Sequence, residues 1–491
     1  MNGFQKRAIG DDEKPQKAAK ITKKTVIQKS ILSRTGKWIK SHIALSIILA
    51  VLAVLLLRGV VGAINTHNLF SLKQIAVSAI SEPIKTDDAG NTNILLIGVG
   101  GEGHDGENLT DTMIVASVDY DNNMVPMLSI PRDIYVENEV VGWGTRINGI
   151  YEHILDATED EELAMSEFLK EIEGIIGMEV HYFVKVDFNG FTGIVDALGG
   201  VEIEVEEEIY DPYYPGPDGS GIIYEPFSIQ AGLQELDGET ALKYARSRYT
   251  TSDFDRAHRQ QKLISAIKDK ALSVGFLLNP MKIKNTLAAL ANSYETNLSL
   301  SQMLNFASVA ADFSGESMVS AVLSDDIWTT GGFLYPPERE YYGGAFVLVP
   351  YRLDFSEIHH FADLFFHNPE VQANQVSIEL LNGTEGEGLA GLSNAYLTRY
   401  GFNVVNTGNA ESKDAFQTRI FPAGESNAML EQTMEALAPL LVDAEILTET
   451  PTEYDPLTWG TSEAEIIVEF GTDYLEFFEE NEDLYYYEYI Y

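Results

Sequence analysis

The sequence predicts an α/β protein with a transmembrane helix near its N-terminus, a larger α/β domain and a smaller one. Between residues 91 and 277, short apolar runs typical of strands alternate with segments whose apolar residues recur at helical spacing. A shorter β-α-β-β-α-β pattern occupies residues 374–471. Residues 43–64 give about 20 largely apolar residues, the length that spans a bilayer core. Strands interleaved with helices favour sheets that are covered by helices.

The segment before the apolar run is strongly basic. Residues 1–42 contain eleven Lys or Arg against three Asp or Glu, although the whole chain has a formal net charge of -42. Positively charged flanks stay in the cytoplasm, so we expect a single-pass membrane protein whose remaining chain lies outside the cell membrane. A cleaved signal peptide is the alternative. The charged segment is too long for one, and no small-residue cleavage site follows cleanly.

The charge distribution argues against nucleic acid as a partner. The acidic body would repel a polyanion, and the basic segment suits a topology signal that also contacts anionic membrane lipid. The chain has no cysteine, which excludes disulfides and thiol chemistry.

The larger domain, residues 91–277, is expected to follow a connector at 65–90. Its predicted strands are 93–98, 112–119, 124–130, 182–187 and 201–205, and its predicted helices are 163–176, 191–198, 237–245 and 255–273. Residues 210–228 are rich in Pro, Gly and Tyr, which predicts a long surface loop. Residues 278–366 are expected to continue this domain with helices.

A domain boundary is expected near residues 366–374. The strands predicted beyond it are 376–381, 402–405, 417–421 and 464–470, and the helices are 389–400 and 429–441. Residues 472–491 are acidic and rich in tyrosine, so we predict a disordered tail.

A glycine-rich segment follows the first predicted strand and fits the pattern G-x-G-x-x-G from Gly98 to Gly103. A dinucleotide site needs a helix to begin there, but the chain runs into another strand instead. The remaining readings are a flexible turn or a loop that brings carboxylates to a metal. Asp111, at the mouth of the next strand, is either a turn residue or shares a hard cation such as Mg²⁺ with Asp105 or Glu102.

Arginines cluster late in the larger domain. Arg246 and Arg248 are two residues apart and would point to one side of an extended chain, while Arg256 and Gln260 lie four apart on one helix face. Arg132 follows a predicted strand that ends at Pro131. Arginine suits bidentate recognition of phosphate, so these side chains predict a pyrophosphate site. Salt bridges to the abundant acids, including a surface pair of Arg132 with Asp133, are the alternative.

Taken in order, these motifs resemble the LytR-CpsA-Psr family of bacterial envelope proteins. The matching residues are 93–98, Thr110-Asp111-Thr112-Met113, Ser129-Ile130-Pro131-Arg132-Asp133, Arg146-Ile147-Asn148, 182–188, 196–201, 236–242, 244–248 and 253–261. Residues 375–471 resemble the small C-terminal domain often attached to that family, through Leu381-Asn382-Gly383-Thr384 and 401–405. The resemblance implies a mixed sheet flanked by helices.

The resemblance also implies a function. Family members transfer a glycopolymer from a polyprenyl-pyrophosphate carrier to a cell-wall acceptor, usually peptidoglycan, with Mg²⁺. By motif position Asp111 would bind the metal and Asp133 would be a candidate general base, as would Asp253. The pyrophosphate would be held by Arg132, Arg146, Arg246, Arg248 and Arg256, with Gln260 beside them. Residues 182–191 and the helix after them would help to wall a lipid tunnel.

Two departures from the family pattern keep other readings open. Leu109-Thr110 stand where the family often has Arg-Ser, and the glycine-rich insertion displaces the first metal carboxylate, for which Asp105 is the substitute. Arg146 also stands where the family often has Lys. A non-enzymatic protein that binds polyprenyl phosphates or wall polymers is therefore the second hypothesis, and an acidic adhesin-like surface protein is the third.

Overall fold

The computed structural model describes residues 83–104, 106–216, 224–247, 253–273, 294–299, 302, 306, 318–352, 354–454 and 462–481. All of them belong to one compact unit, Ser81–Tyr491. The predicted membrane-spanning stretch 43–64 lies outside these residues, as do the basic segment 1–42, Asp105 and Arg248. Within the described ranges, no helix is both long enough and apolar enough to cross a membrane.

The larger domain is built on a mixed six-stranded sheet in the order β11-β6-β1-β2-β3-β12. The strands are β1 (Thr92–Val99), β2 (Thr110–Val118), β3 (Val125–Ser129), β6 (Tyr182–Asp187), β11 (Tyr294–Thr296) and β12 (Met318–Val322). β1, β2 and β3 are antiparallel neighbours, whereas β6 runs parallel to β1 and β12 parallel to β3. The predicted mixed α/β sheet is confirmed.

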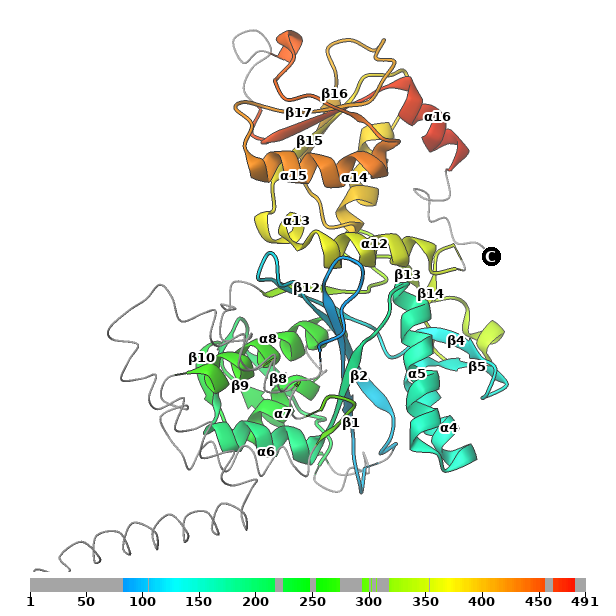
Figure 1. Cartoon of the computed structure of the whole chain (residues 1–491), viewed down its shortest axis with the longest axis vertical. Coiled ribbons are helices and arrows are strands. Elements are labelled where there is room, and N and C mark those ends of the chain that lie inside the picture. Colours follow the sequence, from blue (N-terminus) through cyan, green and yellow to red (C-terminus); the bar gives the residue numbers. More distant parts are fainter. Residues whose placement is uncertain are drawn as a thin grey trace, which may run out of the picture. The chain divides into compact units, whose positions relative to one another are not determined.

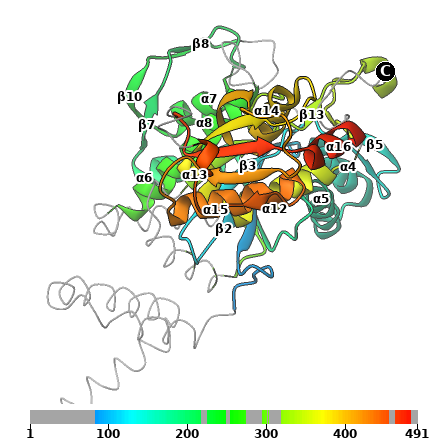
Figure 2. The same ribbon diagram turned by 90° about the horizontal axis from the view of Figure 1, so that it is seen from above.

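Both faces of this sheet are covered, because side chains along β1 alternate between them. Leu95 and Ile97 join the core formed with α4 (Ile150–Thr158) and α5 (Glu161–Ile176), while Leu96 packs with Ile264 of α8 on the other face. The helices α6 (Phe188–Leu198), α7 (Gly238–Arg246) and α8 (Asp253–Leu272) lie on this second side. Figures 1 and 2 both separate α6, α7 and α8 from α4 and α5.

A second small core joins these three helices to a two-stranded sheet of β7 (Val201–Val205) and β10 (Gly232–Leu236). Strict alternation in β7 buries Val201, Ile203 and Val205 and exposes the glutamates between them. Asp237 caps α7 by accepting the Thr240 N–H. Gly238 opens α7 against α6, where a Cβ would lie 2.3 Å from the Thr192 carbonyl oxygen, so only glycine fits.

The prediction of helices for residues 278–366 is wrong in part. Met318–Val322 forms the edge strand β12, and β13 (Leu334–Tyr335) pairs with β14 (Val349–Pro350). The sequence Met-Val-Ser-Ala-Val is short and β-branched, which suits a strand once β3 supplies a partner. The helix α12 (Ser356–His367) then ends the segment.

The C-terminal domain has a five-stranded sheet in the order β16-β15-β19-β17-β18. Its elements are β15 (Ser377–Asn382), α14 (Leu389–Arg399), β16 (Asn403–Asn409), β17 (Arg419–Pro422), α15 (Ala428–Leu437), β18 (Glu445–Ile446) and β19 (Ile466–Phe470). The predicted β-α-β-β-α-β order is present, with β18 added. α13 (Pro369–Asn374) stands at the expected boundary, and the main hydrophobic core continues across it from Phe366 to Val376.

The tail was predicted to be disordered from residue 472, and this is wrong for its first part. Thr472–Glu480 forms the helix α16, in which Tyr474 is fully buried and stacks on Phe470 with ring centroids 4.6 Å apart. The acidic composition concealed an apolar face made by Tyr474, Phe477 and Phe478, which recur at helical spacing. Residues 482–491 lie outside the described residues.

Candidate pyrophosphate site

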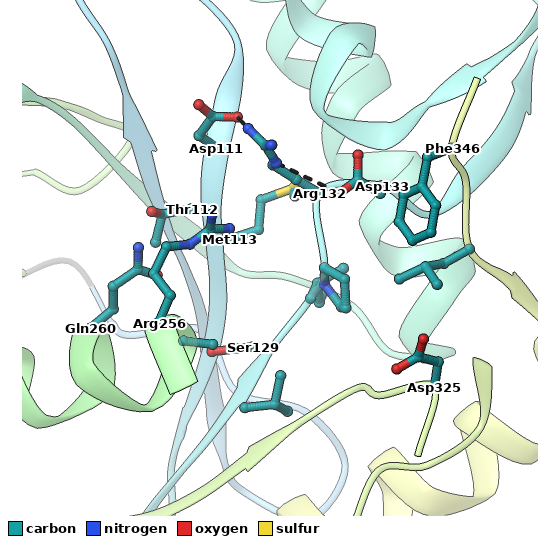
Figure 3. Close-up of a pocket in the computed structure, with 15 residues that line it drawn as sticks. Asp111, Thr112, Met113, Ser129, Arg132, Asp133, Arg256, Gln260, Asp325 and Phe346 are labelled. Carbon is teal, nitrogen blue, oxygen red and sulfur yellow. Dashed lines mark hydrogen bonds and ion pairs between the residues drawn. The ribbon is translucent and has the colours of Figure 1, made fainter. Parts of the chain in front are cut away.

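Two adjoining pockets lie at the ends of β2 and β3, where the first turns of α8 meet the sheet. They share Asp111, Thr112, Arg132, Arg256 and Gln260. Figure 3 shows Arg132 between Asp111 and Asp133, with Arg256 and Gln260 reaching from α8 toward Thr112 on β2. Side chains that are far apart in the sequence, from Asp111 to Leu348, therefore converge on one place.

Arg132 is the centre of a chain of charged contacts. Its Nη1 lies 2.7 Å from Asp111 Oδ1 and its Nε lies 3.6 Å from Asp133 Oδ2. The buried Asp133 also pairs with Arg146, at 3.1 Å between Oδ1 and Nη1. Arg146 ends the hairpin of β4 (Tyr135–Asn138) and β5 (Trp143–Arg146), which folds it back toward Asp133. Asn148 donates to Asp111 Oδ1 at 3.3 Å.

The predicted pair of Arg132 with Asp133 is therefore present, but it is part of a larger arrangement. The shorter contact of Arg132 is with Asp111, which sequence spacing did not predict. A partly exposed guanidinium held between two carboxylates keeps a fixed direction, and its planar fork remains the group that best matches phosphate oxygens. Asp133, flanked by two arginines, orients them.

Arg246 is the last residue of α7 and is held by aromatic rings. Its guanidinium carbon lies 4.1 Å from the centroid of Phe188, and its Nη1 donates to the Tyr214 hydroxyl at 3.1 Å. Burial raises the pKa of Tyr214, although Arg246 partly opposes that shift. Residues 210–228 were predicted to be a surface loop. That prediction is wrong at the buried Tyr214 and at both ends of the segment, where β8 (Ile209–Asp211) pairs with β9 (Phe227–Ile229). Cation–π stacking fixes Arg246 without neutralising it.

Arg256 and Gln260 lie one turn apart on α8 and both line the two pockets, as their spacing predicts. Arg259, on the same helix, does not line either pocket. Its Nε donates to the Tyr244 carbonyl at 3.0 Å, its Nη2 donates to the Ser247 carbonyl, and burial lowers its pKa. Arg259 thus ties α8 to the end of α7, and so positions Arg246.

Gln261 fixes the other side of α8 to the sheet. Its buried Nε2 lies 3.0 Å from Ser129 Oγ, 2.9 Å from the Ala321 carbonyl and 3.2 Å from the Met127 carbonyl. These contacts set the distance between α8 and the strands β3 and β12. Arg256 and Gln260, on the same helix, take their positions from this anchor.

We expect Gln261→Leu to lower the free energy of unfolding by about 1–3 kcal/mol, since it removes the shared donor of buried acceptors. Urea denaturation followed by circular dichroism measures this. Gln260→Leu is the matched control, because the contact of Gln260 with the Ala245 carbonyl is long, at 3.5 Å. Equal unfolding midpoints for the two variants would contradict the role of Gln261 as an anchor.

The glycine-rich segment connects the antiparallel strands β1 and β2, so no helix begins there. The expected connection from strand to strand is present, and the turn from strand to helix that a dinucleotide site needs is not formed between β1 and β2. Among the described residues there is no group of three or more His, Cys, Asp or Glu that would hold a metal ion, and Asp105 lies outside them. Asp111 offers one hard carboxylate, which fits Mg²⁺ because this ion commonly uses one or two protein carboxylates together with substrate phosphates and water.

Several pocket residues were not predicted from the sequence. Phe188 and Asp211 line the pocket that contains Arg246, and Asp211 accepts the Ser247 hydroxyl at 3.0 Å. Asp325 and Phe346 line the other pocket. Phe188 falls within residues 182–191, which the resemblance placed in the wall of a lipid tunnel, although it was not singled out. Asp325 and Phe346 belong to no recognisable motif.

Comparison with known proteins finds two families that match different parts of the chain. Residues 63–340 match the LytR_cpsA_psr family, and residues 375–474 match the family described as LytR cell envelope-related transcriptional attenuator. The cell wall biosynthesis protein LcpA of Corynebacterium glutamicum is 27% identical over 402 residues, covering 73% of this chain and 71% of LcpA.

A second relative is the polyisoprenyl-teichoic acid--peptidoglycan teichoic acid transferase TagV of Bacillus subtilis. It is 28% identical over 238 residues, which are 48% of this chain and 55% of TagV. The crystal structure of B. subtilis TagV aligns with 56% of this chain and 97% of its own, at 22% identity and a TM-score of 0.43.

Proposed function

Because the chain belongs to the LytR-CpsA-Psr family, we propose that it transfers a glycopolymer from a polyprenyl-pyrophosphate carrier to a cell-wall acceptor, with peptidoglycan as the expected acceptor. The observation that carries this proposal is the convergence of Arg132, Arg246 and Arg256 with Asp111 around two adjoining pockets. A diphosphate carries the charge that three fixed guanidinium groups complement.

The larger pocket suits the diphosphate of the donor. It has a cavity volume of about 390 Å³ and is lined by Arg132, Arg246, Arg256 and Gln260. Guanidinium groups whose directions are fixed before the reaction stabilise the charge that develops on a transferred phosphoryl group. Arg146 holds Asp133, and we assign Arg248 to the same donor site from its place in the motif.

Asp111 is the proposed ligand of Mg²⁺, with Asp105 as the second. When bound, Mg²⁺ supplies Lewis-acid neutralisation of charge on the phosphoryl oxygens. The side chains of this protein orient the guanidinium groups toward the diphosphate. Asp111 and Asp133 orient Arg132, and Phe188 and Tyr214 orient Arg246.

Residues 43–64 are proposed to anchor the chain in the cell membrane, with residues 1–42 in the cytoplasm and the domains outside. A polyprenyl carrier is a membrane lipid, so its diphosphate lies at the membrane surface. An anchor on the same chain would tether the pockets to the membrane that contains this donor. The anchor is therefore part of how the enzyme reaches its donor.

The test uses the full chain in detergent micelles with Mg²⁺, a polyprenyl-pyrophosphate-linked glycan and peptidoglycan fragments. We expect polyprenyl monophosphate to be released and the glycan to become attached to the fragments. Arg246→Ala should slow both. The control Lys170→Ala removes an exposed cation of α5 that pairs with Glu167, and it should react like the unaltered chain.

Two results would overturn the proposal. The first is transfer that is untouched by Arg246→Ala. The second is a protein that binds the donor lipid equally well in EDTA and never releases product, which would favour the non-enzymatic scaffold.

A further inference from the structure

The two pockets divide the site into a donor side and a second side. The residues that line both pockets include the charged side chains of Asp111, Arg132 and Arg256. From these residues, the pocket with Phe188 and Arg246 continues toward α6 and α7. The other pocket, with a cavity volume of about 110 Å³, continues toward β12 and the segment after β13. A displacement at phosphorus needs a nucleophile on one side and a leaving group on the other, so two pockets that meet at the arginines suit the two substrates.

The second side has its own chemistry. Beyond the shared residues, its wall includes the apolar Val322 and Leu348, the ring of Phe346 and the carboxylate of Asp325. In Figure 3, Asp325 and Phe346 lie on the opposite side of the pocket from Arg256 and Gln260. Phe346 is 40% exposed, and the Arg339 guanidinium carbon lies 5.6 Å from its ring centroid. An aromatic face beside a carboxylate suits a sugar, which has an apolar C–H face and hydroxyl groups.

Asp325 is held in place by a tight loop. Ser324 and Gly331 are joined by a backbone hydrogen bond of 2.8 Å, and the Gly331 N–H donates to the Arg399 carbonyl of α14 at 2.9 Å. A Cβ on Gly331 would lie 2.2 Å from the Val322 carbonyl oxygen, and one on Gly332 would lie 2.1 Å from the Asp326 carbonyl oxygen. The loop therefore has little freedom, and the C-terminal domain supports it through α14.

We propose that Asp325 is the general base that takes the proton of the acceptor hydroxyl, and that Phe346 is the face against which the acceptor sugar lies. This inference rests on the proposed function, and it assigns the acceptor side of the same site. Burial raises the pKa of the Asp325 carboxyl, and the charge of Asp326 raises it further, so this carboxylate binds a proton more readily than an exposed one. Asp133, the other carboxylate in this pocket outside the shared residues, forms ion pairs with Arg132 and Arg146 and so serves to orient them.

An acceptor hydroxyl oxygen forms a bond to the phosphorus that carries the glycan, while its proton passes to the Asp325 carboxylate. The bond between that phosphorus and the bridging oxygen breaks, and polyprenyl monophosphate leaves with the electron pair. The product is a phosphodiester between glycan and acceptor. Asp325 returns its proton to water.

The test measures transfer and donor binding separately on the full chain in detergent micelles. Asp325→Asn should lower kcat for transfer by about 10²–10⁴-fold, the usual contribution of a general base, while binding of a fluorescent polyprenyl pyrophosphate stays within about twofold. Retained donor binding also shows that the variant is folded. Asp363→Asn is the matched control, because it alters an exposed carboxylate of α12 that lines neither pocket, and its kcat should stay within about twofold.

Phe346→Ala should raise KM for the peptidoglycan fragment and leave the affinity for the donor unchanged. Phe416→Ala, which removes a phenylalanine that is 82% exposed in the C-terminal domain, is its control. Transfer by Asp325→Asn at the unaltered rate, or loss of donor binding in that variant, would refute the acceptor-side assignment and leave the proposed function standing. Absence of transfer by the unaltered chain would refute both.

Discussion

Replacing Arg256 by alanine is expected to lower the rate of glycopolymer transfer by about 10²–10³-fold, the cost of removing one preorganised group from a developing oxyanion. Arg256 is only 8% exposed and is one of the five residues common to both pockets. A positive charge between the two pockets stabilises the negative charge that develops on the phosphoryl group while one bond to phosphorus forms and another breaks. This holds whichever pocket binds the donor. The loss of Arg256 should therefore appear in kcat more than in donor affinity.

The shape of the side chain matters as well as its charge. Arg256→Lys keeps one positive charge but loses the planar fork that binds two oxygens, so we expect it to recover only part of the lost rate. Lys262→Ala is the matched control on α8, where Lys262 pairs with Glu206 at 2.8 Å away from both pockets. Steady-state transfer with saturating acceptor gives the comparison. Equal rates for Arg256→Ala and Lys262→Ala would remove Arg256 from the reacting centre.

The secondary structure was predictable where the apolar residues recur with a clear period. β6 (Tyr182–Asp187) and β7 (Val201–Val205) begin and end at the residues expected, and in β7 the strict alternation of valine or isoleucine with glutamate shows the period directly. β12 was missed because Met-Val-Ser-Ala-Val does not alternate apolar with polar residues, whereas the equally short β7 does. α16 was missed because the acidic composition of the tail was given more weight than the spacing of Tyr474, Phe477 and Phe478.

The sequence predicted those residues of the site that belong to short local motifs. Arg256 and Gln260 share a helix face, and four-residue spacing is enough to show that. The contacts of Arg246 with Phe188 and Tyr214 join residues that are far apart in the chain, so no local pattern could reveal them. The Asp325 carboxylate reaches the pocket only because β12 pairs with β3, and that pairing belongs to the topology.

The second large effect is expected at Asp111. We expect Asp111→Asn to lower transfer about 100-fold or more, because a metal ligand contributes several kcal/mol of charge stabilisation and each 1.4 kcal/mol changes a rate tenfold. The variant should also need more Mg²⁺ to reach its own maximal rate. A titration of the transfer rate with Mg²⁺ measures both effects. Asp121→Asn, at the turn between β2 and β3 beyond the opposite end of β2, is the control.

The choice of asparagine separates the two roles that the structure allows Asp111. Asparagine keeps an oxygen that can accept from Arg132, so the direction of that guanidinium is largely preserved, whereas the anionic ligand for a hard cation is lost. If Asp111 serves mainly to aim Arg132, Asp111→Asn will retain most of the rate and the Mg²⁺ requirement will not move, which would contradict its role as a metal ligand. A double-mutant cycle that combines Asp111→Asn with Arg132→Lys then measures the coupling energy between Asp111 and Arg132 directly. Strong coupling without a change in the Mg²⁺ requirement would make the 2.7 Å contact between Asp111 and Arg132 the whole function of this carboxylate.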